Sequence, residues 1–115
     1  MSMFDSVTSV ALKSAADGLA LRQRVIANNV ANINTPTFLA GKVKFEDALK
    51  RAVAQGSGVA EPTIARSLEP TRTDGNNVNL DQETLLNVDT NLRYQLTTQA
   101  LDGKFSSLRV ALRTN

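Results

Sequence analysis

The placement of proline and glycine constrains this fold more than any other feature of the sequence. All three prolines and four of the six glycines lie between residues 34 and 79. The flanking stretches contain no proline and one glycine each, Gly18 and Gly103. Proline breaks helices and glycine weakens them. The sequence therefore predicts a single all-α domain in three parts: a long helix in residues 1–34, an irregular middle segment in 35–79 and a long helix in 80–115.

The first predicted helix has apolar residues on two opposite faces. Its main stripe recurs every seven residues, as in a coiled coil, and consists of Leu12, Leu19, Ile26 and Ile33. At about 100° per residue, a second stripe falls on the other side of the helix, at Val7, Val10, Leu21 and Val25. A single neighbouring helix can cover only one of these stripes, so the second requires a different partner.

The second predicted helix also has two stripes. One consists of Leu85, Val88, Leu92 and Leu96. The other is rotated from it by roughly 160° and consists of Tyr94, Leu101, Phe105, Leu108 and Leu112. We expect Leu85, Leu92 and Leu96 to pair with the main stripe of the first helix, as a coiled coil. The remaining stripes of both helices would then meet other subunits. The helix either kinks near Gly103 or turns its two halves toward different neighbours.

The middle segment offers little apolar material to cover those stripes. Val43 and Phe45 alternate with lysines, which predicts a short strand, and residues 46–54 read as a short helix. Two interpretations follow: either this segment folds back over the remaining stripes, or other chains cover them. We favour the second, because the segment has few large apolar side chains and exposed stripes of this length usually mark interaction surfaces.

The composition excludes most catalytic chemistry. The chain has no histidine and no cysteine, so it lacks a histidine relay, a thiol nucleophile, the usual zinc ligands and disulfides. Its acidic residues are scattered, so a small hydrolase would lack the acid–base pair that it needs. The net charge of +2 gives no argument for nucleic acid. We expect no enzyme activity, no cofactor, no metal, no small-molecule substrate, no cleaved signal peptide and no membrane span.

Four asparagines fall within residues 28–34, at the predicted end of the first helix. Each costs a helix about 0.5 kcal/mol relative to alanine. A helix cap explains Asn32 or Asn34, because Thr35 and Pro36 stop the helix there. It does not explain Asn28 and Asn29, which lie one turn earlier. Amides at those positions can pair with an adjacent backbone and fix the register between packed elements.

The same run resembles the N-terminal signature of bacterial flagellar axial proteins, with motif residues Asn28, Asn29, Ala31, Asn32, Asn34, Thr35 and Pro36. Residues 45–49, 74–83, 91–95 and 104–106 are similar to the flagellar basal-body rod protein family, and within it to the proximal rod subunits. The resemblance covers nearly the whole chain. This family usually has glycine after the Thr-Pro pair, where the present chain has Thr37. Because β-branched residues are strained at positive φ, we expect the loop to take a different path.

The resemblance implies a structural subunit whose terminal helices pair as a coiled coil and pack with neighbouring subunits into a hollow helical rod. It implies export through the flagellar type III apparatus without signal cleavage, and a place in the periplasmic rod near the inner membrane. The implied partners are other copies, other rod subunits, the membrane-ring adaptor and the export gate, and the implied role is to transmit torque. The alternative is a cytosolic helical adaptor or secretion chaperone that forms a small closed oligomer.

Overall fold

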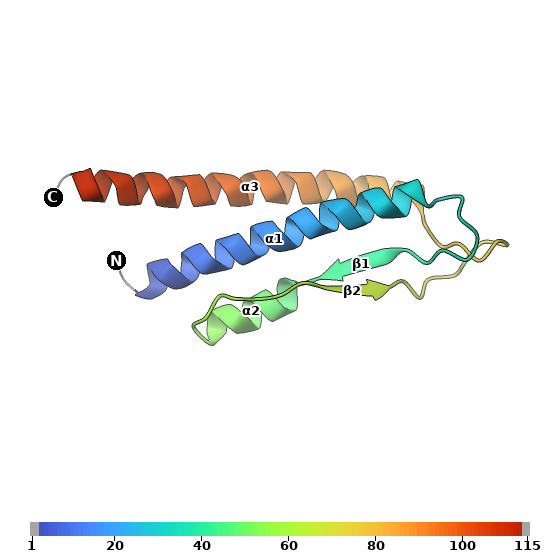
Figure 1. Ribbon diagram of the computed structural model, residues 1–115, viewed down its shortest axis with the longest axis horizontal. Coiled ribbons are helices and arrows are strands. Elements are labelled where there is room, and N and C mark those ends of the chain that lie inside the picture. Colours follow the sequence, from blue (N-terminus) through green and yellow to red (C-terminus); the bar gives the residue numbers. More distant parts are fainter. Residues whose placement is uncertain (1–2, 114–115) are drawn as a thin grey trace.

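The computed structural model describes residues 3–113, apart from the side chains of residues 3–6 and 108 (Figure 1). In chain order its elements are helix α1 (Met3–Ala31), strand β1 (Gly41–Lys44), helix α2 (Glu46–Ala54), strand β2 (Thr63–Arg66) and helix α3 (Leu80–Arg113). The molecule is elongated, with extents of 66 × 25 × 15 Å. The prediction of a mostly helical fold with long terminal helices is confirmed.

Helices α1 and α3 are neighbours that lie closest where α1 ends and α3 begins, and Figure 1 shows them separating toward the two termini. Helix α3 continues through Gly103, and Figure 1 shows it straight, without the kink that the sequence allowed. A single glycine costs a helix only about 1 kcal/mol, which a helix of 34 residues tolerates. None of the described helices combines the length and apolarity needed to cross a membrane.

The middle segment contains a small antiparallel sheet in place of the single predicted strand. Gly41 pairs with Arg66 and Lys44 pairs with Thr63. Phe45 lies just beyond the sheet, at the start of α2. The second strand was missed because its side chains are largely exposed, so its sequence lacks the alternation of apolar and polar residues by which half-buried strands are recognised.

The apolar core lies between α1 and the sheet. Leu19, Val43 and Phe45 form its buried centre. A Cβ on Gly18 would lie 2.7 Å from the Phe45 ring, so glycine is required for this close approach. Five partly buried residues pack around the centre: Ala15, Leu21, Val25, Leu49 and Tyr94.

This core corrects the assignment of the second stripe of α1. Leu21 and Val25 were predicted to face neighbouring subunits, but both pack against the core of the same chain. A Cβ on Gly41 would come within 3.0 Å of Val25 Cγ1, so β1 lies directly over this face. Val7 and Val10, at the start of the same stripe, are half-buried. The prediction failed because a few well-placed groups in the middle segment suffice to cover half of α1.

Candidate functional site

The asparagine cluster of α1 and the second asparagine-rich run, around residue 76, meet at one end of the molecule. We call this meeting point the junction; it comprises Asn29, Asn32, Arg72, Asn76 and Asn77 with the backbone that they bind. The sequence placed its two halves in separate segments and gave no sign that they touch. Nearly all of its hydrogen bonds join a side chain to the backbone, so they fix the path of the chain.

Asn29 connects α1 to the first strand. Its side chain is buried, at 1% exposure. The Nδ2 group donates to the Gly41 carbonyl at 2.9 Å and to Glu83 Oε1 at 3.2 Å, while Oδ1 accepts from the Gly41 N–H at 2.8 Å. The amide thus pairs with both backbone groups of Gly41, as a neighbouring strand would. The expectation that an amide in the cluster pairs with an adjacent backbone is confirmed at Asn29.

Asn76 closes the C-terminal end of α1. Its Nδ2 donates to the carbonyls of Asn32 and Thr35 at 2.8 and 2.9 Å, and its Oδ1 accepts from the Val78 N–H at 2.7 Å. Both carbonyls lie in the turn just after α1, where they also accept the N–H groups of Thr35 and Phe38. The Asn76 amide adds a second hydrogen bond to each of them, from a segment 41 to 44 residues away. The end of α1 and the approach to α3 are therefore joined.

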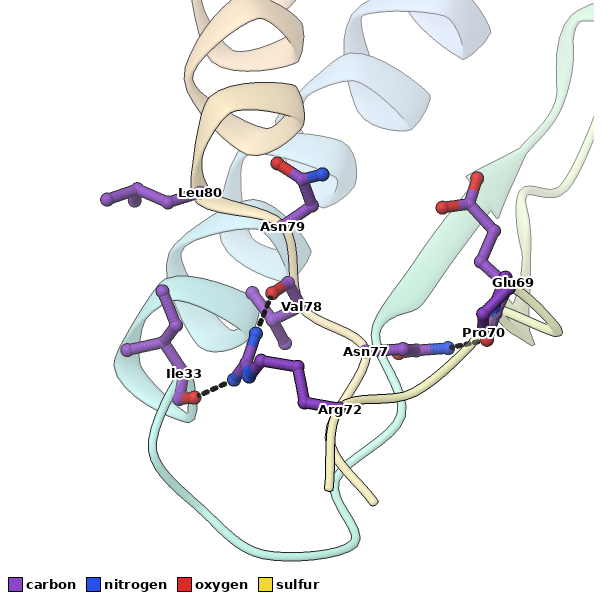
Figure 2. Close-up of a pocket in the computed structure, with 8 residues that line it drawn as sticks. All are labelled: Ile33, Glu69, Pro70, Arg72, Asn77, Val78, Asn79 and Leu80. Atoms are coloured by element: carbon purple, nitrogen blue, oxygen red, sulfur yellow. Dashed lines mark hydrogen bonds between the residues drawn. The ribbon is translucent and has the colours of Figure 1, made fainter. Parts of the chain in front are cut away.

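Asn77 and Arg72 complete the junction. Asn77 Nδ2 donates to the carbonyls of Ser67 and Glu69, both at 3.1 Å, and its Oδ1 accepts from the Ala40 N–H at 2.7 Å. Figure 2 shows the Arg72 guanidinium between the turn after α1 and the segment that leads into α3, where it donates to the Ile33 and Val78 carbonyls. These side chains lie beside a pocket of about 340 Å³.

The other motif residues are exposed. The carbonyl of Asn28 accepts from Asn32 Nδ2 at 2.8 Å. Ala31 ends α1, and Asn34, Thr35 and Pro36 are exposed in the turn that follows. Thr37 has φ 64°, the one positive φ among the described non-glycine residues. The expectation of a different path is wrong in this respect: the backbone keeps the left-handed turn, held by a 2.8 Å hydrogen bond from the Thr37 N–H to the Asp74 carbonyl.

A buried carboxylate fixes α3 against the rest of the chain. Glu83 is 1% exposed, and its Oε1 accepts from Asn29 and forms an ion pair with Lys42 Nζ at 3.2 Å. Glu83 Oε2 and Thr90 Oγ1 are buried without a hydrogen-bond partner in the described part of the chain. Sequence patterns did not identify Glu83, because an acidic residue in the first turn of a helix is already explained by the helix dipole.

This contact sets the rotation of α3 and corrects the predicted seam. At about 100° per residue, Glu83, Thr90, Tyr94 and Leu101 share one face, and that face meets α1 and the core. Tyr94 and Leu101 were predicted to face other subunits, yet both are half-buried. Of the other residues assigned to that surface, Phe105 and Leu112 are exposed, and the Leu108 side chain lies outside the described residues.

The predicted seam of α3 lies on the opposite side of the helix. Leu85, Leu92 and Leu96 are 72%, 55% and 56% exposed, so their assignment to an intrachain seam is wrong for the single chain. With Val88 they form what we call the outer stripe. On α1, by contrast, Leu19 and Ile26 are buried, and Leu12 and Ile33 are half-buried.

Arg22 is a second buried charge that the sequence did not single out. Its guanidinium donates to Glu46 at 2.6 and 3.0 Å and to the Val43 carbonyl at 2.7 Å, and it lies 4.9 Å from the centre of the Phe45 ring. Burial would raise the pKa of the Glu46 carboxyl, but hydrogen bonds from Arg22 and from the backbone at residues 45 and 46 outweigh it. The pKa of Glu46 therefore lies below its usual value.

A groove of about 510 Å³ runs between α1 and α3 beside the junction. Its lining is mainly apolar on the α1 side and mixed on the α3 side, and consists of Gln23, Ile26, Ala27, Val30, Ala31, Leu80, Glu83, Thr84 and Asn87. Next to it, Gln23 Nε2 donates to Asn91 Oδ1 at 2.7 Å and links the two helices. The site as a whole thus offers a fixed junction, an exposed apolar stripe and a groove.

Comparison with known proteins identifies the kind of protein that carries this site. The family described as flagella basal body rod protein matches residues 11–38, which include the asparagine cluster. The flagellar basal body rod protein FlgB of Bacillus subtilis is 31% identical in an alignment that covers 97% of each chain. FlgB of Borreliella burgdorferi is 28% identical over 84% of this chain and 89% of its own, and that of Escherichia coli K12 is 29% identical over 83% and 85%.

These likenesses agree with the site, whose described residues offer an exposed apolar stripe and a groove for packing. The prediction of a structural protein is confirmed by the relatives, all of which are rod proteins. Because the likeness to the Bacillus subtilis protein extends over almost the full length of both chains, this chain belongs to the FlgB family of flagellar basal body rod proteins.

Proposed function

We propose that this chain is a structural subunit of the proximal rod, which joins the membrane ring and the export gate to the rest of the rod and transmits torque. Its partners are other copies of itself, other rod subunits, the ring adaptor and the gate. Membership of the rod family supports this role. So does the shape of the chain, in which two long helices provide an extended surface for neighbours.

The observation that carries the proposal is the outer stripe of α3. Its four side chains are all more than half exposed, and they follow one another along three turns of the helix. Exposed apolar surface of this extent is unfavourable for a solitary chain and usually marks a protein interface. Neighbouring rod subunits would cover it, together with Phe105 and Leu112 near the end of α3.

The junction supports the mechanical part of the proposal. Force applied to one long helix reaches the other through Asn76 and Arg72, which bind the backbone of both the end of α1 and the segment leading into α3. Hydrogen bonds to backbone groups hold the chain path itself, so the two helices would turn together. Coiled-coil pairing of α1 and α3 around Leu12, Leu19, Ile26 and Ile33 would tighten as the chain enters the rod.

We place the assembled chain in the periplasmic part of the basal body near the inner membrane, after type III export without removal of an N-terminal signal. Sequencing the first residues of the chain recovered from purified basal bodies tests this route. The expected N-terminus is that of the chain as translated, with at most the initiator methionine removed. Loss of some twenty residues would contradict export without cleavage.

A double substitution on the outer stripe, Leu85→Asp with Leu92→Asp, tests the structural role. We expect a folded chain, because neither side chain contributes to the core, but cells with this variant as their only copy should build no rod and should not swim. Gln82→Asp, an exposed position outside the stripe on the same helix, is the matched control and should swim normally. Normal swimming of the double variant would contradict the proposal.

A further inference from the structure

The outer stripe of α3 and the groove between α1 and α3 are two uncovered surfaces that face different directions. At about 100° per residue, the outer stripe falls within a sector of roughly 80°, whose middle lies roughly 180° from that of the inward face of α3. The groove, in contrast, lies at the border between α3 and α1, where Ala27 and Ala31 form one edge and Leu80 the other. A chain therefore cannot place its own outer stripe in its own groove.

We propose that the outer stripe of one copy of this chain docks in the α1–α3 groove of a second copy. This pairing rests on the proposed rod function and names the partner of the stripe. The two surfaces differ, so each copy can use both at once, one toward each neighbour. Repetition of such a heterologous contact builds an open helical assembly instead of a closed dimer.

The shape of the groove suits an incoming helix. Ala27 and Ala31 are exposed, and their small side chains leave the α1 edge of the groove low. Helices pack with their axes about 8–10 Å apart, and small residues at the contact favour the closer end of that range. Ile26 and Val30 supply apolar surface between the two edges, against which the leucines of the outer stripe can pack.

Charge favours the groove over a second outer stripe as the partner. Asp81 borders the outer stripe, and Arg24 lies on the exposed face of α1 beside Ala27 and Ala31. Asp89, on the other border of the stripe, is already paired with Arg93 of its own chain at 3.0 Å. Arg24 and Asp81 form no ion pair within the described part of the chain. Two outer stripes placed face to face would bring the acidic groups of both copies together, whereas a stripe in the groove brings them toward Arg24.

The polar part of the groove suits the same partner. The exposed amides of Gln95 and Gln99 lie on the same side of α3 as the outer stripe, so an incoming copy carries hydrogen-bond donors beside its leucines. Thr84 and Asn87 line the α3 side of the groove and offer side-chain oxygens as acceptors.

The absence of native cysteine allows a direct test. Cysteines are introduced by Ala27→Cys in the groove and Val88→Cys on the outer stripe, singly and together, with Ala31→Cys as a second groove position. Each variant serves as the only copy in its cells, and basal bodies are treated with a short bismaleimide. We expect the paired variants to give a ladder of dimers, trimers and larger species, and each single variant to stay monomeric on a denaturing gel.

Each contrary result has a separate meaning. Dimers from Val88→Cys alone would show stripe-to-stripe pairing, and a bond only to a different rod subunit would show another occupant; either overturns the proposal. A paired variant that remains monomeric in cells that swim would also overturn the pairing. That result would leave the proposed rod function unaffected. Absence of the chain from the basal bodies of swimming cells would instead overturn the rod function. If cells with a paired variant fail to swim, the same cross-linking is carried out on the purified, folded variant at high concentration. Absence of the ladder there would also overturn the pairing.

Discussion

The junction and the outer stripe of α3 reverse the usual distribution of polar and apolar groups. At the junction, the side chains of Asn29, Asn76 and Asn77 are buried, and each binds specific backbone groups. On the outer stripe, leucine and valine are mostly exposed. The contrast teaches that directional hydrogen bonds hold the path of the single chain at the junction, whereas on α3 a row of apolar side chains is left uncovered by that chain.

The largest expected effect in this comparison comes from Asn29→Ala. The substitution leaves both backbone groups of Gly41 buried without a partner, at about 1–3 kcal/mol for each unsatisfied group. We expect a loss of about 3 kcal/mol in the free energy of unfolding, measured by urea denaturation with circular dichroism. Asn28→Ala, on the exposed side of the same helix, and Leu92→Ala, on the outer stripe, are controls that should each change it by under about 1 kcal/mol. Equal losses at Asn29 and Leu92 would break the comparison.

Lys42→Met tests whether the buried carboxylate of Glu83, which binds Asn29 of the junction, depends on its ion pair. Removing one partner of a fully buried pair costs about 3–5 kcal/mol. The Lys42 side chain is 31% exposed, so we expect a smaller loss, about 2 kcal/mol in the same unfolding measurement. When Lys42→Met is made in a chain that already carries Glu83→Gln, it leaves no buried carboxylate without a partner. There it should cost less than half as much free energy of unfolding. An unchanged cost would show that Lys42 acts through packing alone.

Thr37→Gly sharpens the comparison in the opposite direction, because it should stabilise the junction. A non-glycine residue in the left-handed region carries strain of about 1–2 kcal/mol, which glycine removes. Glycine also makes the unfolded chain more flexible, and this offsets part of the gain in stability. We expect a net gain of about 1 kcal/mol, seen as a higher urea midpoint. Thr35→Gly, where φ is not positive, should destabilise the chain. A gain at both positions would argue against strain as the cause.

The smallest expected effect is a pH dependence from Glu46. Its pKa in the folded chain is below the usual value of 4.5, so it stabilises the fold above that pH and loses this contribution as the pH falls through the lower, folded-state pKa. The Glu46 side chain is 47% exposed, so solvent screening keeps the contribution under about 1 kcal/mol. Unfolding measured from pH 6 to pH 3 should show a shallower decline in Glu46→Gln than in the parent chain.

The sequence alone determined the helical elements and the family. Proline and glycine mark where the long helices end, seven-residue spacing identifies the buried side of α1, and the asparagine run carries the likeness to rod proteins. These features involve residues close together in the chain, so they can be recognised from the sequence without the structure. The exposed strand β2 escaped detection because local alternation was absent.

Only the tertiary structure decided which face of α3 looks inward. Helical periodicity gives the angle between two stripes of one helix, but not the rotation of that helix against its neighbours. Here the rotation is set by Glu83, which binds Lys42 and Asn29 from segments 41 and 54 residues away. The junction has the same origin, since Asn76 meets the end of α1 only after the chain has folded back. Contacts between distant segments leave no periodic pattern, and for that reason the outer stripe was assigned to the wrong side.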